Sequence, residues 1–345
     1  MIRLLTISST TSSRSQVAFE RVRPVRAFLV LPIAAIVMLA PCRRALARGA
    51  DPTPLIIFHA DSLTAYMATL THRFEAAHPS VVVQTQSSGS LDAIRKITDL
   101  HLPCDMLITA DWRLLAKPRP GIEPWVVIFA GNSMGLLYTP TSADASKINA
   151  RNWYKVITRP GVRYGHSNPM RDPAGYWTLI MWQLAQRYYH VPGLAKRLAA
   201  DCPPSNIRPH NVDLISLLQS GDLDYYFGYA SDARLGNLRF LALPPQINLG
   251  DIKLRKEYSK AAVEIGRGAA RHTIHGAPIA YGATLVANAP HRALALKFLK
   301  LMLGPAGRKA AEQQGLKGYS KSYYVDPQAR MPAALRAITR PLSAH

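Results

Sequence analysis

The segment Tyr164–Ile180, YGHSNPMRDPAGYWTLI, determines how this chain of 345 residues is organised. Its first part is rich in Ser, Asn and Pro and predicts a turn, and Asp172-Pro173-Ala174-Gly175 then leads into an apolar helix that starts near Tyr176. Pro173 suits the first helical turn, because the N–H that proline lacks has no partner there. Such a loop directs several backbone N–H groups toward one point. That point favours a bound anion.

Asp172 has two possible roles in this segment. Aspartate is a favoured capping residue, so its carboxylate can simply accept a hydrogen bond from the first N–H groups of the helix. Alternatively, Asp172 faces a ligand held at the start of the helix. The segment by itself leaves both roles open.

Outward from this segment, the first third of the chain alternates strands and helices. Short apolar runs at Leu55–His59, Val81–Gln86 and Met106–Thr109 predict buried strands, separated by two amphipathic helices. A β-α-β-α-β series predicts a parallel sheet. We expect further strands at Trp125–Phe129, Met134–Tyr138, Asp224–Phe227 and Ile279–Leu285, and helices at Leu194–Ala200, Val212–Gln219 and Ala289–Leu303.

Polar residues stand where several of these strands end and helices begin. Ser62 follows the first strand at the cap of a helix, and Ser90 follows a donor-rich turn in which Gly89 lets the backbone approach a ligand closely. Tyr229 ends a strand beside a glycine, at the edge of the sheet where ligands bind in open α/β folds. Asn211 precedes a helix and could be a plain cap or a ligand-facing residue.

Six segments, in order, resemble the molybdate/tungstate-binding proteins of ABC importers, in the tungstate-type branch of that family. The resemblance extends from about residue 54 to 315. The segments are FHADSL at 58–63, SSGSLDAIRKITDL at 87–100, DMLITADW at 105–112, SNPMRDPAGY at 167–176, LISLLQSGDLDY at 214–225 and PIAYGATL at 278–285.

The resemblance implies an α/β fold of the periplasmic binding protein type II class, with two α/β lobes of mixed sheets joined by crossover strands. Residues 48–132 and 278–345 would form lobe I, and residues 133–277 would form lobe II. Ligand binding would close the lobes on each other. We expect the Pro- and Arg-spotted tail Gly318–His345 to pack loosely or fray.

The resemblance also implies a ligand, a tetrahedral tungstate or molybdate ion, and no other cofactor. Asp172 would be a direct ligand of the metal in the oxyanion. In this family a glutamate stands where this chain has Asn211, whose neutral amide can donate a hydrogen bond to an oxyanion oxygen. Another anion, such as sulfate, phosphate or an organic acid, is the alternative ligand. The residues that would bind the oxyanion are Ser62, Ser90, Asp172, Ala174 through its backbone N–H, Asn211 and Tyr229.

The N-terminus predicts export. The apolar segment Ala27–Ala40 follows several arginines and precedes Ala45-Leu46-Ala47, which is the pattern of a secretory signal peptide over residues 1–47. Cys42 allows a second reading as a lipoprotein with membrane association, and an uncleaved anchor is a third. Together with this export signal, the resemblance implies a periplasmic protein, expected to be a monomer, that delivers its ligand to an ABC permease.

Charge and motifs argue against other functions. The formal net charge is +21, and loss of residues 1–47, with seven Arg and one Glu, leaves +15. No compact Lys/Arg block with interleaved aromatic residues indicates nucleic acid, and no G-x-S-x-G, P-loop or H-E-x-x-H indicates an enzyme. His166 stands near Asp172, but no nucleophile accompanies them. Cys104 and Cys202, which the resemblance places on different lobes, should be free thiols.

Overall fold

The computed structural model describes residues 52–268 and 271–342, so the predicted signal peptide and both alternatives to it lie outside the described residues. A seven-stranded sheet has the order β14-β13-β4-β12-β3-β1-β2. β1 pairs parallel with β2 and β3, as the alternating pattern predicts, whereas β12 runs antiparallel to β3 and β4. The strands are β1 Thr53–Ala60, β2 Val81–Ser88, β3 Met106–Thr109, β4 Val126–Gly131, β12 Ala280–Leu285, β13 Lys317–Val325 and β14 Arg340–Pro341.

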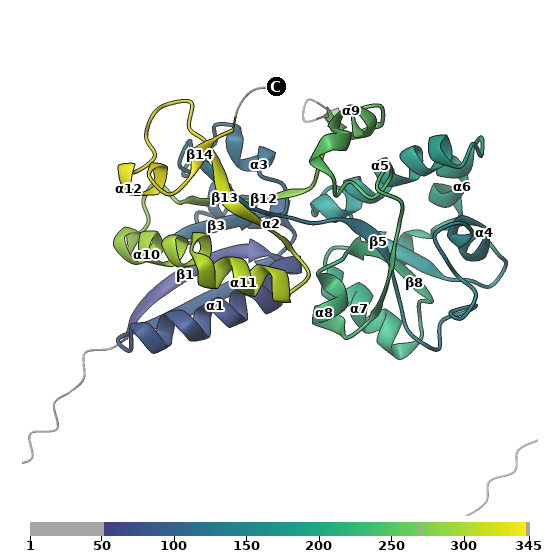
Figure 1. Cartoon of the computed structure of the whole chain (residues 1–345), viewed down its shortest axis with the longest axis horizontal. Helices are drawn as coiled ribbons and strands as arrows, with labels where there is room; N and C mark the ends of the chain where they lie inside the picture. The colour runs from purple at the N-terminus through teal and green to yellow at the C-terminus, as the bar shows by residue number, and fades with distance from the viewer. Residues whose placement is uncertain (1–51, 269–270, 343–345) are drawn as a thin grey trace, which may run out of the picture. The chain divides into compact units, whose positions relative to one another are not determined.

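Helices cover this first sheet (Figure 1). In α1 the residues Tyr66, Met67, Leu70 and Phe74 recur at helical spacing and are all buried, so one face of the helix packs on the sheet. α11 has Pro305 in its first turn, where proline is tolerated. The helices of this part are α1 Thr64–Ala77, α2 Ser90–Thr98, α3 Arg113–Ala116, α10 Arg292–Leu303, α11 Pro305–Gln313 and α12 Ala333–Arg336, with a 3-10 turn at Asp61–Leu63.

A second sheet of five strands has the order β7-β6-β8-β5-β9. β6 runs parallel to β7 and β8, and β5 runs antiparallel to β8 and β9, so this sheet is mixed as well. The chain changes sheet over Asn132 and Ser133, between β4 and β5. The division into lobes at residues 133 and 278 stays a prediction. The strands are β5 Met134–Tyr138, β6 Tyr164–Ser167, β7 Ile207–Arg208, β8 Tyr225–Tyr229 and β9 Arg239–Ala242.

The helix that the deciding segment predicts is α5, Pro173–Tyr188, and it packs across the second sheet. Trp182 lies edge-on to Tyr164 of β6 and to Phe227 of β8. Such edge-to-face pairs add about 0.5–1.5 kcal/mol each to the burial of the rings. This aromatic cluster anchors α5 on the sheet. The other helices of this part are α4 Trp153–Ile157, α6 Leu194–Asp201, α7 Asn211–Ser220, α8 Asp232–Gly236 and α9 Arg255–Tyr258, with 3-10 turns at Pro204–Asn206 and Ile252–Leu254.

The C-terminal tail differs from the expectation of loose packing. β13 pairs antiparallel with β4, and Met331 and Leu335 beyond it are buried. Without β13, the hydrogen-bonding edge of β4 would be exposed, and a paired edge is more stable than an open one. The expectation for Gly318–His345 was therefore wrong for residues 318–325 and for these two side chains.

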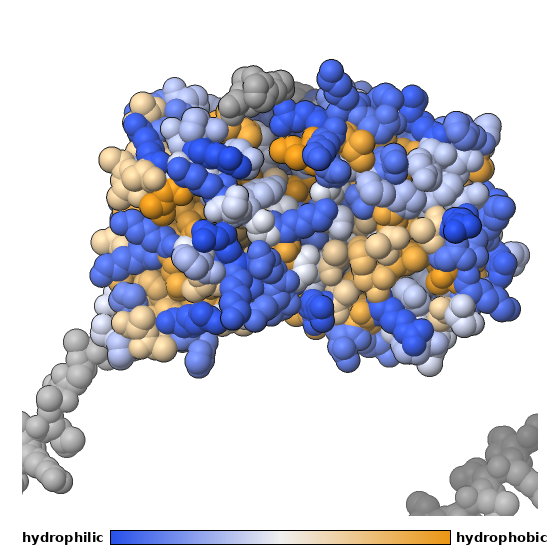
Figure 2. All heavy atoms as spheres, viewed as in Figure 1, coloured by the Kyte–Doolittle hydropathy of each residue, from blue (hydrophilic) through white to orange (hydrophobic). Residues whose placement is uncertain are grey.

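The two cysteines, one short hairpin and the surface complete the description of the fold. Cys104 and Cys202 are buried free thiols, as predicted, and burial raises the pKa of each to about 12. His272 and His275 are exposed and belong to a hairpin of β10 Ala262–Ile265 and β11 His272–His275. Hydrophilic side chains cover much of the face seen in Figure 2. Within the described part of the chain, no helix combines the length and apolar character needed to cross a lipid bilayer.

Candidate anion site at the strand ends

The loop before α5 is held in one conformation by its own polar groups. Asp172 is the N-cap of α5, and its Oδ1 accepts a hydrogen bond from the Ala174 N–H at 2.9 Å. Gly175 is needed for this fold, because a Cβ at this position would lie 2.3 Å from the Ser167 carbonyl oxygen. The capping role of Asp172 is therefore present. The N–H of Ala174, which we expected to face an anion, donates to that carboxylate instead.

The electrostatic environment of Asp172 favours its protonated form. Burial is the largest cause that raises its pKa well above the usual range, and the nearby carboxylate of Asp61 adds to it. The hydrogen bond from Ala174 acts in the opposite direction, while Asp232 and Asp92 raise the pKa further. A protonated carboxyl group can donate a hydrogen bond, whereas an ionised one only accepts. Asp172 can thus meet an anion without the repulsion of two like charges.

Among the buried polar atoms that have no partner within the described residues, four belong to residues at the ends of strands or at the start of α7. They are Ser88 Oγ at the end of β2, Ser167 Oγ at the end of β6, Tyr229 OH at the end of β8 and Asn211 Oδ1 at the start of α7. A buried polar atom without a partner costs about 1–3 kcal/mol, so it calls for an explanation. These atoms lie at strand ends and a helix start, where α/β proteins bind ligands. A polar ligand held among them would remove that cost.

Asn211 does not act as a helix cap. α7 begins at Asn211 with His210 at the N-cap, and that cap makes no side-chain hydrogen bond. The Asn211 Nδ2 group donates to Asp232 Oδ1 at 2.9 Å, which leaves Oδ1 without a partner. One N–H of the amide that we expected to donate to an oxyanion is therefore directed to Asp232.

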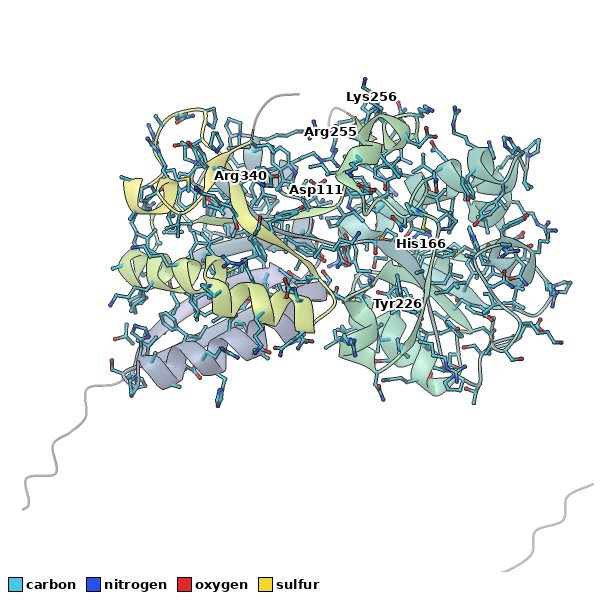
Figure 3. The ribbon with its side chains drawn as sticks, viewed as in Figure 1. Asp111, His166, Tyr226, Arg255, Lys256 and Arg340 are labelled. Atoms are coloured by element: carbon cyan, nitrogen blue, oxygen red, sulfur yellow. The ribbon has the colours of Figure 1, made fainter. Side chains whose placement is uncertain are left out.

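Asp232 connects three residues around the predicted site. Its Oδ2 accepts from the Tyr229 backbone N–H at 3.0 Å and from the hydroxyl of Tyr226, which Figure 3 labels. Complete burial raises its pKa to about 7, although the hydrogen bonds from Tyr226, Tyr229 and Asn211 lower it. Asp232 was not among the predicted site residues. The sequence pattern that could have identified Asp232 is an aspartate three positions after a strand that ends in Gly-Tyr.

The two predicted serines on the first sheet already have protein partners. Ser62 Oγ lies 2.9 Å from the hydroxyl of Tyr281, which also accepts from Asn132 Nδ2. Ser90 Oγ accepts from the Ala110 N–H at 3.0 Å and is fully buried. Both hydroxyls therefore contribute to the protein's own hydrogen-bond network.

Hydrogen bonds join elements of the first sheet to elements of the second. The Tyr176 hydroxyl donates to Asp111 Oδ2 at 2.9 Å, and Arg171 Nε donates to Asp92 Oδ2 at 2.6 Å. The Leu91 N–H donates to the Arg171 carbonyl at 3.1 Å. A Cβ on Gly89 would lie 2.4 Å from that carbonyl oxygen. Gly89 therefore permits close approach of the loop before α5, a contact that we had expected with a ligand.

Asp61 also takes part in this contact. Its Oδ2 lies 3.0 Å from His210 Nδ1, and burial raises its pKa while His210 lowers it. The structure gives this carboxylate a partner in the second part of the molecule.

The family model for bacterial extracellular solute-binding proteins matches residues 55–317. This chain belongs to that family.

Curated relatives of this solute-binding protein have similar lengths and substantial identity. The molybdate/tungstate-binding protein WtpA of Thermococcus kodakarensis is 36% identical over 284 residues, covering 74% of this chain and 80% of the relative. WtpA of Pyrococcus abyssi is 34% identical over 288 residues, covering 76% and 83%. A solute-binding protein of Petrotoga mobilis is 39% identical over 264 residues, covering 76% and 82%.

Solved structures support the fold. The periplasmic molybdate-binding protein of Azotobacter vinelandii superposes with a TM-score of 0.52 at 18% identity, covering 79% of this chain and all of that chain. The sulfate-binding protein SubI of Mycobacterium tuberculosis superposes with a TM-score of 0.52 at 14% identity, covering 78% and 88%. The predicted class, an α/β periplasmic binding protein with mixed sheets, is confirmed.

His166 is a buried core residue of this solute-binding protein. Burial lowers its pKa to about 4, and Nδ1–H donates to the Ser167 carbonyl at 2.8 Å. Its ring lies edge-on to Trp182, with the centroids 5.2 Å apart. The imidazole is therefore neutral near pH 7 and stabilises the end of β6.

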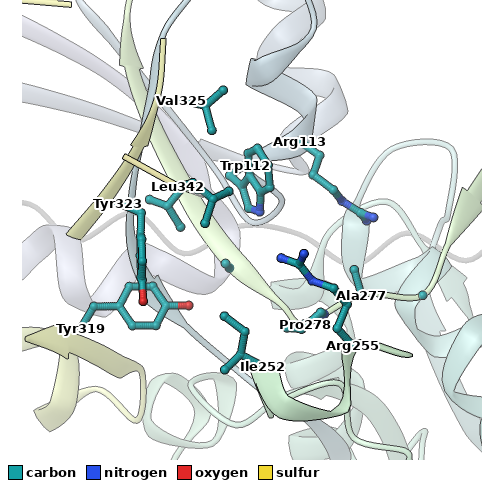
Figure 4. A pocket seen from close by; sticks show the side chains of 13 residues that line it. Trp112, Arg113, Ile252, Arg255, Ala277, Pro278, Tyr319, Tyr323, Val325 and Leu342 are labelled. Atoms are coloured by element: carbon teal, nitrogen blue, oxygen red, sulfur yellow. The ribbon is translucent and has the colours of Figure 1, made fainter. Parts of the chain in front are cut away.

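A separate pocket of about 520 Å³ has a different chemical character. In Figure 4, Tyr319 and Tyr323 of β13 lie on one side of it, and Trp112 and Arg255 lie on the other. Its walls are mainly apolar, and none of the six predicted oxyanion residues lines it. An oxyanion needs converging hydrogen-bond donors, so the strand ends suit it better than this mainly apolar pocket.

Proposed function

We propose that this solute-binding protein takes up tungstate or molybdate for an ABC importer and holds the ion among the strand ends beside α5. The observation that carries the proposal is the set of four buried unpartnered atoms at Ser88, Ser167, Asn211 and Tyr229. The similarity to proteins named as molybdate/tungstate-binding supports the choice of ligand.

The donor chemistry suits a tetrahedral oxyanion. The hydroxyls of Ser88, Ser167 and Tyr229 can each donate one hydrogen bond, and hydrogen bonds to charged acceptors are stronger than those between neutral groups. Asp172, with its raised pKa, can approach the anion as a carboxyl group. A tungsten or molybdenum centre can also accept additional oxygen ligands, which the sulfur of sulfate cannot do.

The remaining parts of the proposal concern the setting. The mature protein would begin near Arg48, act in the periplasm as a monomer and deliver the ion to a membrane permease. It would carry no cofactor, bind no nucleic acid and catalyse no reaction. The parts built on the two sheets, residues 48–132 with 278–345 and residues 133–277, would act as lobes that close on the ion. N-terminal sequencing of exported protein tests the first of these statements.

A thermal-shift series with tungstate, molybdate, sulfate and phosphate tests the ligand. A ligand that binds only the folded state stabilises it by about 4 kcal/mol at a thousand times its Kd. We expect a clear rise in Tm with tungstate or molybdate, and a smaller rise with the other two anions. A rise with sulfate or phosphate alone would assign the site to that anion, and no rise with any of the four would refute an oxyanion site.

A further inference from the structure

The amide of Asn211 has a fixed orientation in this structure. Its Nδ2 group donates to Asp232 Oδ1, and the Asn211 side chain is buried with its Oδ1 unpartnered. The other oxygen of Asp232 is already engaged by Tyr226 and by the Tyr229 N–H. Asp232 Oδ1 is thus the acceptor left for Asn211, and an amide group that gives its N–H to Asp232 must present its oxygen elsewhere.

The atom that faces a ligand decides which ligands are accepted. An amide oxygen is an acceptor, so it repels the outer oxygens of a fully deprotonated tetrahedral anion and offers them no hydrogen bond. The same oxygen is attractive to a metal centre that can take another oxygen ligand. An amide N–H in that place would have the reverse preference, because it donates to any oxyanion oxygen.

We propose that Asp232 is a positioning residue that directs the oxygen of Asn211 into the anion site and so favours metal oxyanions over sulfate. The proposal rests on the proposed function of this site. Asp232 also holds the backbone of Tyr229, so one carboxylate places two residues of the predicted site.

The variant Asp232→Asn tests this idea, because its effect on the amide can be worked out atom by atom. The oxygen of the new side chain is needed by the two donors, Tyr226 and the Tyr229 N–H. Its NH₂ group then stands where Asp232 Oδ1 stood, and it cannot accept from Asn211 Nδ2. Asn211 must turn to offer its oxygen to this NH₂ group, which brings Nδ2 into the anion site.

We expect Asp232→Asn to lower the ratio of tungstate to sulfate affinity by about tenfold or more, the effect of one hydrogen bond to a charged group. Calorimetric titration with each anion gives the ratio directly. The exposed Asp222→Asn makes the same change of charge on the same part of the chain, and it should leave the ratio unchanged.

A double-mutant cycle separates positioning from a general structural effect. In the Asn211→Ala background there is no amide to turn, so Asp232→Asn should leave the ratio as it is. An equal change of the ratio in both backgrounds would overturn the proposal. So would an unchanged ratio in a folded Asp232→Asn protein.

Asn211→Ala alone provides a measurement that does not need the Asp232 variant to fold. If the amide oxygen faces the site, its removal should weaken tungstate binding and leave sulfate binding equal or tighter. A loss of sulfate affinity of tenfold or more would show that the amide donates to the anion, and would overturn the proposal. If the unmodified protein bound none of these anions, the proposed function itself would fail, which is a distinguishable result.

Discussion

The strand ends of the two sheets carry similar polar residues but use them differently. On the first sheet, Ser62 and Ser90 are bonded to Tyr281 and to the Ala110 N–H. On the second sheet, Ser167 and Tyr229 are buried and have hydroxyls without a partner in the described structure, as does Ser88 at the end of β2 on the first sheet. Hydroxyls of the first kind stabilise the fold, whereas those of the second kind lower stability until a ligand reaches them. The unpartnered hydroxyls, two from the second sheet and one from the first, therefore indicate the binding site more clearly than the bonded ones.

Two glycines show the same contrast between the regions. A Cβ on Gly175 would collide with the backbone of its own loop, at Ser167 and Pro169. A Cβ on Gly89 would collide with the Arg171 carbonyl, which belongs to the part of the chain built on the other sheet. The first glycine is needed to fold one region, and the second to bring two regions together.

The largest expected effect is on Gly175→Ala. The new methyl group would meet three backbone atoms at 2.3–2.6 Å, and backbone cannot move aside as a flexible side chain can. We expect the free energy of unfolding, measured in urea, to fall by about 3 kcal/mol, at the upper end of the range for overpacking. Gly304→Ala is the matched control, because its nearest atom would be 3.4 Å away. Equal stability of both variants would contradict the tight loop.

The second prediction concerns pH and uses one buried histidine from each sheet. Burial lowers the pKa of His59 and of His166 from 6.5 to about 4. The unfolded chain therefore binds these protons first, and the stability present above pH 6.5 is lost as the pH falls toward 4, at about 1.4 kcal/mol per pH unit for each histidine.

The test compares variants, because Asp61, Asp172 and Asp232 have raised pKa values and change stability in the opposite direction. His166→Gln should remove the contribution of one histidine, about 2–3 kcal/mol between pH 7 and pH 4.5. Replacement of the exposed His72 by Gln should leave the pH profile as it is. Identical profiles for His166→Gln and the unmodified protein would show that His166 is protonated normally in the fold.

Tyr229→Phe should affect binding but not folding. The hydroxyl is buried and has no partner in the described residues, so its removal costs the empty protein nothing. We expect tungstate affinity to fall about tenfold to a hundredfold, the range for a hydrogen bond to a charged group. Tyr188→Phe, on an exposed ring, serves as the control. Unchanged affinity in Tyr229→Phe would remove this residue from the site.

Local patterns in the sequence predicted part of the secondary structure, but not the elements that depend on distant pairing. Five of the seven strands of the first sheet followed from short apolar runs, and the cap of α5 followed from Asp172-Pro173, because both patterns are local. β13 was missed, since its strand state depends on pairing with the distant β4.

The candidate site shows the same limit. Motif positions predicted residues that lie at strand ends and helix starts, but not which of their atoms already have partners. Ser90 and Tyr229 looked equivalent in the sequence, yet Ser90 is used by Ala110, twenty positions along the chain. Asp232 was missed because its role depends on Asn211, which is far from it in sequence. Hydrogen-bond partners of this kind become known only with the tertiary fold.

Ser90→Ala is predicted to reduce stability. It would leave the Ala110 N–H buried without an acceptor, at a cost of about 1–3 kcal/mol. Ser216→Ala, in an exposed position on α7, is the control and should change the free energy of unfolding little. Unaltered stability together with lost tungstate binding would instead favour the direct ligand role that the resemblance implies.

Ser62→Ala should have the smallest effect, and the hydrogen-bond directions around Tyr281 give the reason. The Tyr281 oxygen accepts from Asn132 Nδ2, so its own proton can be donated to Ser62 Oγ. The Ser62 proton is then available for an anion. Loss of the Ser62 hydroxyl leaves Tyr281 with Asn132 as a partner, so the free energy of unfolding should fall by only about 0.5–1.5 kcal/mol. We expect tungstate affinity to fall less than in Tyr229→Phe, by about threefold to tenfold, for the loss of a single shared hydroxyl.

Tyr281→Phe should weaken binding through Ser62, so calorimetry on the two single variants and the double variant should show effects that do not add. Additive effects would mean that Ser62 and Tyr281 act on the anion independently.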